Sequence, residues 1–278
     1  MTDEPGAAAP DLEAERKGVL EHWNKDAVES MYDKHLLQAE IRLISRWVPR
    51  DSKVLDAGCG EGEGTRVYAG IPGVVVHGAD FADTRLKMAA RRLRGLRNVT
   101  LKKVDFLDPY ELDRDYDVVV SQRFLINIPG WRRQQQVLAG LLERLRKGGT
   151  LVLLEGSQQG VAELNAFRAL WGLAPIPVKW HNYFVRDDDL KAFMRARGAQ
   201  LLCEDGLGAY FMLTRGVRPV LDKNLAWDCP FNRAAASEPM AEALGLGARF
   251  SRLRLWVFRK GGQRARSAQL SAKRRSIG

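Results

Sequence analysis

Residues 54–64 read Val-Leu-Asp-Ala-Gly-Cys-Gly-Glu-Gly-Glu-Gly, and this stretch decides the fold. An apolar run ends at Asp56, and four glycines then alternate with other residues. Glycine has no Cβ and readily adopts positive φ, so such a loop lets a ligand approach the backbone closely. At the carboxyl end of a parallel strand, a loop of this kind binds nucleotide-like ligands.

The spacing of the glycines distinguishes between such ligands. A dinucleotide-binding loop requires Gly-x-Gly-x-x-Gly. Counted from Gly58 the last position is Glu63, and counted from Gly60 it is Thr65. The dinucleotide pattern therefore fails in both registers, and the pattern that fits is Asp-x-Gly-x-Gly-x-Gly.

Apolar runs and amphipathic segments alternate on both sides of this loop, which predicts β-α-β units and a parallel sheet. The patterns predict strands at 53–56, 74–80, 99–105, 116–121, 150–155, 200–205 and 252–259. They predict helices within 11–48 and at 62–69, 84–97, 131–147, 161–171 and 186–197. The stretches 172–183 and 207–247 are expected to be irregular.

Over residues 37–155 the chain resembles the class I S-adenosylmethionine-dependent methyltransferases. The resemblance implies an α/β fold, a Rossmann-like three-layer sandwich with a seven-stranded, mostly parallel sheet. Helical or loop insertions are expected after the fifth strand and before the last. We expect one domain with N-terminal helices, a cofactor-binding half and a substrate-binding half, flanked by disordered ends. The domain spans 11–260, with the N-terminal helices at 11–48, the cofactor-binding half at 53–155 and the substrate-binding half at 156–260. The disordered ends are 1–10 and a basic tail at 261–278.

The resemblance assigns cofactor contacts at three strand ends. Asp80, followed by Phe81, matches the acid that binds the ribose hydroxyls, although an acid there also suits a helix N-cap. Asp105 and Phe106 match the residues that bind the adenine amino group and its ring. The alternative for Asp105 is a turn formed with the following Asp108-Pro109.

Asp56 matches the acid that contacts the methionine ammonium group, and it could equally bond to free N–H groups of the next helix. The resemblance places Gly58 and Gly60 beside the methionine moiety and assigns Gly62 to the turn and to helix packing. Ser121 is a further expected cofactor contact.

Residues 121–127 follow the fourth strand and would face the transferable methyl group in this family. They contain neither the Asn/Asp-Pro-Pro-Tyr motif of amino-group methylation nor a cysteine nucleophile. No carboxylate occupies this strand end to anchor Mg²⁺, and the histidines and cysteines lack zinc-ligand spacing. We therefore expect no metal.

Four residues are candidates for contact with the acceptor. Glu155 ends a strand, His181 lies in an aromatic loop, and either would serve as a base for a hydroxyl acceptor. Arg123 and Arg168 would hold an anionic acceptor. The alternatives are a structural role for His181 and surface ion pairs for the arginines.

Composition restricts the cellular setting. The net charge is +10, and the body of the chain is basic as well as its tail. The apolar runs are too short to span a bilayer, and the N-terminus lacks the pattern of a signal peptide. Three cysteines without framework spacing indicate a reducing compartment, so we expect a cytoplasmic protein that does not bind membranes.

The sequence predicts O-methylation of a polar small molecule, glycan or natural product, and permits an anionic acceptor. The glycan expectation comes from a looser likeness of the acceptor-side residues to methyltransferases of surface-polysaccharide pathways. One alternative is an RNA methyltransferase, which the basic charge favours and the missing RNA-binding module disfavours. Another is a non-catalytic partner protein that binds S-adenosylmethionine. The oligomeric state is not specified by the sequence.

Overall fold

The computed structural model describes residues 12–25, 31–222 and 224–261. The expected disorder of 1–10 and of 261–278 lies outside the described residues except at Gly261, whose N–H donates to the Gly198 oxygen at 3.1 Å. The strands are β1 (Lys53–Ala57), β2 (Val75–Asp80), β3 (Val99–Lys103), β4 (Tyr116–Gln122), β5 (Leu145–Gly156), β6 (Ala199–Gly206) and β7 (Leu253–Lys260).

The first seven helices are α1 (Leu12–Trp23), α2 (Lys34–Ser45), α3 (Glu63–Ala69), α4 (Asp83–Arg92), α5 (Trp131–Arg144), α6 (Gln158–Ala169) and α7 (Asp187–Ala196). Shorter helices before the last strand are α8 (Gly208–Phe211), α9 (Arg218–Leu221), α10 (Pro230–Ala235) and α11 (Glu238–Leu244). A π-helical segment, Met212–Val217, joins α8 to α9.

The strands form one seven-stranded sheet in the order β3-β2-β1-β4-β5-β7-β6. β7 is antiparallel to β5 and β6, whereas the pairs from β3 through β5 are parallel. The seven-stranded, mostly parallel Rossmann-like sandwich expected from the sequence is therefore confirmed. Because β1 and β4 are neighbours, the loops after these two strands meet at one edge of the sheet.

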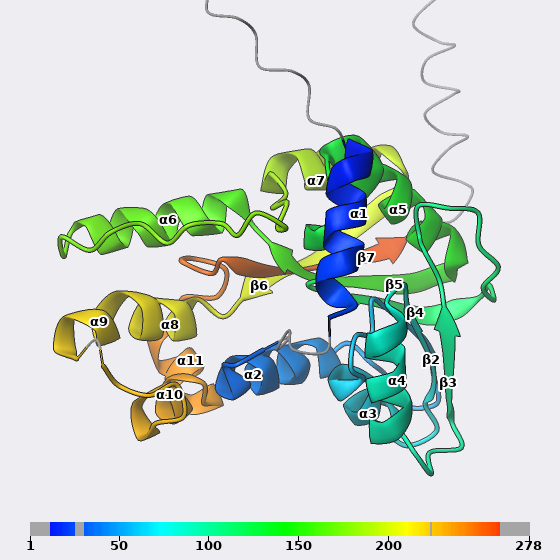
Figure 1. Ribbon diagram of the computed structural model, residues 1–278, viewed down its shortest axis with the longest axis horizontal. Coiled ribbons are helices and arrows are strands. Elements are labelled where there is room, and N and C mark those ends of the chain that lie inside the picture. Colours follow the sequence, from blue (N-terminus) through cyan, green and yellow to red (C-terminus); the bar gives the residue numbers. More distant parts are fainter. Residues whose placement is uncertain (1–11, 26–30, 223, 262–278) are drawn as a thin grey trace, which may run out of the picture.

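Alternating side chains of the strands build two apolar layers, because successive residues point to opposite faces. Val54 belongs to the cluster that includes helices α2 and α3, and Leu55 to the cluster that includes α5 and α7. Figure 1 shows these helix pairs on opposite sides of the sheet. The sheet is thus covered on both faces, and its loop-bearing edge stays available to a ligand.

Several predicted boundaries differ from the structure; α4 ends at Arg92 rather than at residue 97, and β3 ends at Lys103 rather than at residue 105. Helix α5 ends at Arg144, and β5 begins at Leu145 rather than at residue 150. β5 accommodates the extra residues through a register shift against β4 between Tyr116 and Val118. The stretch 207–247, expected to be irregular, instead holds α8 to α11 and the π-helical segment.

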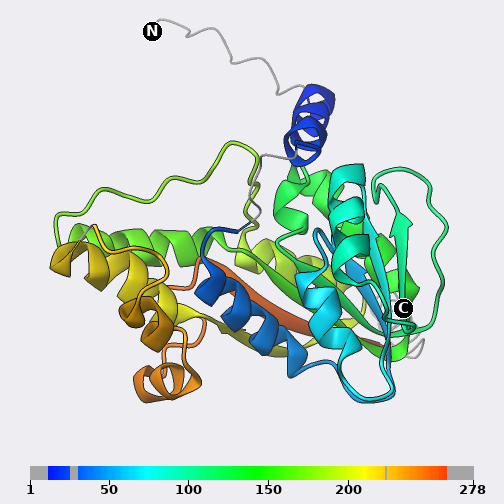
Figure 2. The same ribbon diagram turned by 60° about the horizontal axis from the view of Figure 1, so that its bottom comes forward.

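Helix α1 lies outside the sheet layers, at the top of the view in Figure 2 (dark blue). It is joined to the body by specific polar contacts. Arg16 pairs with Asp105, and the Trp23 indole N–H donates to the Asn127 side chain at 3.1 Å. Helix α1 therefore lies over the loops that follow β3 and β4. Among the described residues, no helix has the length and apolarity needed to cross a membrane.

Candidate active site

A cavity of about 540 Å³ opens at the carboxyl ends of β1, β2 and β4. Asp56 and Asp80 lie on its wall at the ends of two of these strands. Helix α1 contributes a second wall, which includes Arg16, His22 and Trp23. The cavity extends to Arg252 and Leu253, near the start of β7. Its position is the one where open α/β sheets bind ligands.

The glycine loop has the backbone that its sequence predicts. Gly58, Gly60 and Gly62 have φ values of 72°, 52° and 80°. A Cβ on Gly58 would lie 2.4 Å from the Cβ of Phe124, whereas a Cβ on Gly60 would meet nothing within 4 Å. The loop thus packs against the segment after β4 at Gly58 and borders open space at Gly60.

Asp80 joins the end of β2 to the glycine loop. Its Oδ2 accepts the Gly60 N–H and its Oδ1 accepts the Ala82 N–H, each at 2.9 Å. Ala82, not Asp80, is the N-cap residue of α4. Burial raises the pKa of the Asp80 carboxyl, which faces the cavity and is 6 % exposed.

Asp56 lies at the end of β1 beside Asp80. Its Oδ2 accepts the Thr65 hydroxyl at 2.6 Å, which ties it to α3. Burial raises the pKa of the Asp56 carboxyl to about 6, and the charge of Asp80 adds to this effect. Two neighbouring buried carboxyls make this end of the cavity suited to a cation.

Asp105 and Phe106, which follow β3, line the cavity, and so does Phe81, which follows β2. Asp105 accepts the Leu107 N–H at 3.0 Å, as in a turn, and also pairs with Arg16 at 2.6 Å. Phe106 is buried, with its ring 5.0 Å from that of Phe124. Both alternatives weighed for Asp105 are thus compatible with its position.

Glu155 is fully buried and organises the segment after β4. It accepts the Ser121 hydroxyl at 2.6 Å. It also accepts the N–H groups of Phe124 and Leu125 at 3.0 Å and of Ile126 at 3.2 Å. Glu155 does not line the cavity. Its carboxylate therefore positions the turn at 124–126, and Ser121 is part of the same arrangement.

At pH 5 we expect Glu155→Gln to lower the free energy of unfolding by about 1–2 kcal/mol, because the Gln amide nitrogen cannot accept the buried Ile126 N–H. Burial raises the pKa of Glu155 to about 7, above the ordinary value of 4.5. Between these values the folded state holds the proton and the unfolded state does not, so Glu155 lowers stability as pH rises. Urea unfolding should show this loss at pH 5, and the difference from wild type should shrink or reverse at pH 7.5, where wild type has lost the contribution of the protonated Glu155. The exposed Glu143→Gln should show no such difference, and an equal difference at both pH values would contradict the assignment.

Arg123 lines the cavity immediately after β4, with a strained φ of 50°. Its Nε lies 3.0 Å from a carboxylate oxygen of Glu40, which is completely buried. Arg168 instead donates to the backbone oxygens of Ala174 and Arg215, and it does not line the cavity. Of the two candidate arginines, the structure thus brings Arg123 to the cavity and not Arg168.

His181 lies on the cavity wall and is 6 % exposed. Its ring stacks on that of His22 from α1, with 4.5 Å between centroids. Burial lowers the pKa of His181 to about 4, and nearby His22 contributes to this shift. The imidazole is therefore neutral near pH 7, and both the structural and the acceptor-site interpretation remain compatible with its position.

Sequence reasoning missed several charged residues that line or support the cavity. Arg215 and Arg252 lie on its wall. The buried carboxyl of Asp33 pairs with Arg215, and that of Glu40 pairs with Arg123. Arg215 lies in a stretch expected to be irregular, and Arg252 was assigned to a strand. The one available signal was an acid at Glu40 within an apolar helical pattern. In the part of the chain that the structure describes, no group of three or more His, Cys, Asp or Glu is arranged to hold a metal.

Comparisons with known proteins agree with this geometry. Residues 54–149 match the family described as a methyltransferase domain. A demethylmenaquinone methyltransferase of Staphylococcus carnosus is 30 % identical over 131 residues, which are 46 % of this chain and 52 % of that protein. The chain thus aligns with about half the length of this curated relative.

Solved structures with the same fold cover almost all of the chain. A magnesium protoporphyrin IX methyltransferase from Synechocystis PCC 6803 with bound SAM superposes with a TM-score of 0.55 at 14 % identity, covering 92 % of this chain and 100 % of that one. The [4+2]-cyclase SpnF gives a TM-score of 0.55 at 16 % identity, with coverages of 90 % and 93 %. At these identities the likeness establishes the fold alone.

Proposed function

We propose that this chain is a class I S-adenosylmethionine-dependent methyltransferase and that it transfers a methyl group from S-adenosylmethionine to an oxygen of a small polar or glycan-type acceptor; the match of residues 54–149 to a methyltransferase domain supports the proposal. The observation that carries the proposal is the position of Asp80. Its carboxylate joins β2 to the glycine loop while facing the cavity.

The residues at this end of the cavity fit the cofactor. Asp80 has the acceptor oxygens that two ribose hydroxyls require, and Asp56 provides negative charge for the methionine ammonium group. Asp105 and Phe106 border the space assigned to adenine. The open side of Gly60 leaves room for the methionine chain. When bound, S-adenosylmethionine supplies an electrophilic methyl group.

On the acceptor side, the residues serve to orient the reacting oxygen, since alignment provides most of the acceleration in such a displacement. The Glu155 carboxylate fixes the backbone at 124–126, next to the end of β4. Neutral His181 is available near pH 7 to accept a hydroxyl proton, although its low pKa makes it a weak base. Arg123 provides positive charge on the same wall.

The test has two parts. Calorimetry with S-adenosylhomocysteine should show binding of the purified full chain, and failure to bind would overturn the proposal.

The second part is incubation with methyl-labelled S-adenosylmethionine and separate small-molecule, glycan and RNA fractions. The label should appear in the small-molecule or the glycan fraction. Label in RNA, with salt-sensitive binding, would support the RNA alternative. Binding without turnover in any fraction would support the non-catalytic alternative, and the cyclase of the same fold shows that this fold also occurs outside methyltransferases.

A further inference from the structure

Two arginines line the cavity at the end away from the glycine loop. Arg252 immediately precedes β7, and Arg215 lies in the π-helical segment after α8. They come from different elements, yet the charge of Arg215 acts on Arg252. This part of the cavity lies beyond the residues that fit the cofactor.

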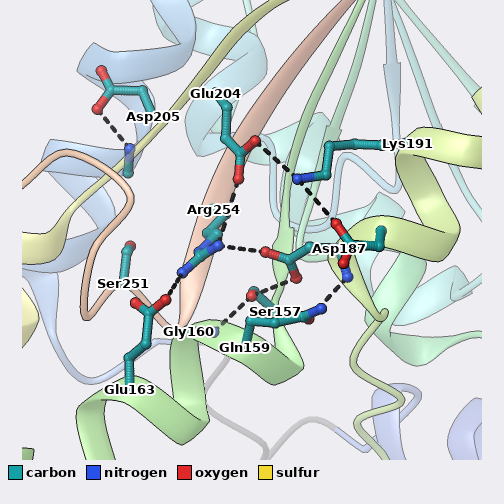
Figure 3. A network of polar contacts seen from close by, with 12 residues as sticks. Ser157, Gln159, Gly160, Glu163, Asp187, Lys191, Glu204, Asp205, Ser251 and Arg254 are labelled. Atoms are coloured by element: carbon teal, nitrogen blue, oxygen red, sulfur yellow. Dashed lines mark hydrogen bonds and ion pairs between the residues drawn. The ribbon is translucent and has the colours of Figure 1, made fainter.

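The pairing of these arginines differs sharply from that of their neighbour Arg254. Figure 3 shows Arg254 surrounded by carboxylates, with Asp187 at 2.5 Å and Glu163 at 2.8 Å. The side chain of Arg252, two residues earlier, makes no hydrogen bond or ion pair within residues 12–25, 31–222 and 224–261, although its backbone oxygen accepts the Ser157 N–H. The same strand end thus carries one fully compensated arginine and one that is uncompensated by described residues.

Arg215 does not supply the missing negative charge. Its guanidinium pairs at 2.7 Å with Asp33, which is 1 % exposed and also accepts the Tyr210 hydroxyl. The Asp33 carboxylate therefore pairs with Arg215 and not with Arg252, whose charge stays uncompensated by described residues. The far end of the cavity keeps a net positive charge.

A half-buried guanidinium without a counterion is costly, because burial removes water and arginine does not readily lose its proton. Burial lowers the pKa of Arg252 to about 10, and Arg215 lowers it further by repulsion. An anion placed here would offset this cost. The planar fork of the guanidinium matches a carboxylate or phosphate with two parallel hydrogen bonds.

The walls beside Arg252 are aromatic and apolar. The Phe184 ring centroid lies 5.4 Å from the Arg252 guanidinium carbon, and Phe211 and Leu253 also line the cavity. The position of Phe184 depends on Gly156, where a Cβ would lie 2.3 Å from its ring. An acceptor that reaches Arg252 must therefore have an apolar or aromatic frame next to its charged group.

The sheet order sets the length of that frame. β7 lies two places from β4, where the transferred methyl group would be presented. Two strand spacings correspond to roughly 10 Å. The anionic group and the methylated atom would thus lie at opposite ends of a small molecule.

We propose that Arg252, with Arg215 beside it, forms an anion subsite that holds a carboxylate or phosphate at the far end of the methyl acceptor. The inference rests on the proposed function, since it names the substrate class of that same site. Arg252 is then a specificity-determining residue and takes no part in methyl transfer itself.

The experiment measures binding to the full chain, alone and loaded with S-adenosylhomocysteine. The carboxylate probes are 4-hydroxybenzoate and 4-hydroxycinnamate, each compared with its neutral methyl ester, and phenyl phosphate is compared with phenol. Wild type should bind at least one anion about tenfold or more tightly than its neutral partner. The carboxylate and phosphate arms show which anion the subsite takes.

Arg252→Gln should abolish this preference, leave S-adenosylhomocysteine affinity unchanged and keep or raise the unfolding midpoint, because it removes an uncompensated, partly buried charge. Arg249→Gln is the matched control, because it removes the same charge from an exposed residue outside the cavity, and it should keep the preference. Wild type without any preference for an anion would overturn the inference, as would a preference that survives in Arg252→Gln. A loss of S-adenosylhomocysteine affinity in Arg252→Gln would also overturn it, because the arginine would then serve the cofactor. Absence of S-adenosylhomocysteine binding to wild type would instead overturn the proposed function.

Discussion

Replacing Asp80 with alanine is expected to weaken S-adenosylmethionine binding by about 3 kcal/mol, or roughly two orders of magnitude in Kd. A charged acceptor contributes about 1.5 kcal/mol or more to each hydrogen bond, and two ribose hydroxyls would lose theirs. The Gly60 N–H, now held at 2.9 Å by Asp80, would also lose its partner, so the glycine loop would be less well fixed.

Isothermal calorimetry with S-adenosylhomocysteine would measure this loss without interference from turnover. Asp83→Ala is a suitable control, since Asp83 begins α4, pairs with Lys103 on the surface and does not line the cavity. Asp80→Asn separates charge from hydrogen bonding, because the amide keeps one acceptor oxygen, and its affinity should lie between those of wild type and Asp80→Ala. An unchanged Kd in Asp80→Ala would show that the ribose assignment is wrong.

The positions of the glycine loop and of Asp80 on the cavity wall were predictable because local rules determine them. Gly58, Gly60 and Gly62 require positive φ wherever they occur in this turn, and Asp80 ends a strand adjacent to β1 in the sheet. A parallel sheet brings the carboxyl ends of neighbouring strands together. The sequence pattern therefore contained both the residue types and their approximate positions.

The acceptor end was less predictable because it depends on long-range pairing. Glu155 at a strand end looks the same in sequence whether it faces a ligand or a neighbouring turn, and only the contacts at 121–126 show which. Arg252, just before β7, and Arg254, within it, are two residues apart, yet only Arg254 meets acids from α6 and α7. Their difference is invisible to a pattern analysis.

Short helices account for most of the difference in the second half. The stretch 207–247 contains helices of four to seven residues, which carry too few turns to produce a periodic pattern. Their positions depend on packing, as at Gly216, where a Cβ would lie 2.4 Å from the Phe167 ring. Arg215 reaches the cavity through this arrangement, so its role could not be inferred from neighbouring residues.

The same substitution, glycine to alanine, should have different effects on stability at two positions of the glycine loop. Gly58→Ala should lower the free energy of unfolding by about 2–4 kcal/mol, because a left-handed φ is unfavourable for alanine and the new Cβ overlaps Phe124. Gly60→Ala carries only the first cost, about 1 kcal/mol, because its Cβ meets no protein atom within 4 Å. The fold should therefore tolerate the second change far better than the first.

The affinity for the cofactor, in contrast, should fall in Gly60→Ala, although this variant loses little stability. The Cβ of Gly60→Ala would occupy space assigned to the methionine chain, so the folded variant should bind S-adenosylhomocysteine about 30-fold more weakly, an overpacking cost of about 2 kcal/mol. Urea unfolding and calorimetry on both variants would measure the two effects separately. Gly95→Ala provides the control, since Gly95 has a φ of 90°, no atom within 4 Å of a Cβ and no place on the cavity wall. It should lose stability as Gly60→Ala does and keep full affinity. If Gly60→Ala also kept full affinity, the methionine chain could not lie against this loop, and the position assigned to the cofactor would have to be abandoned.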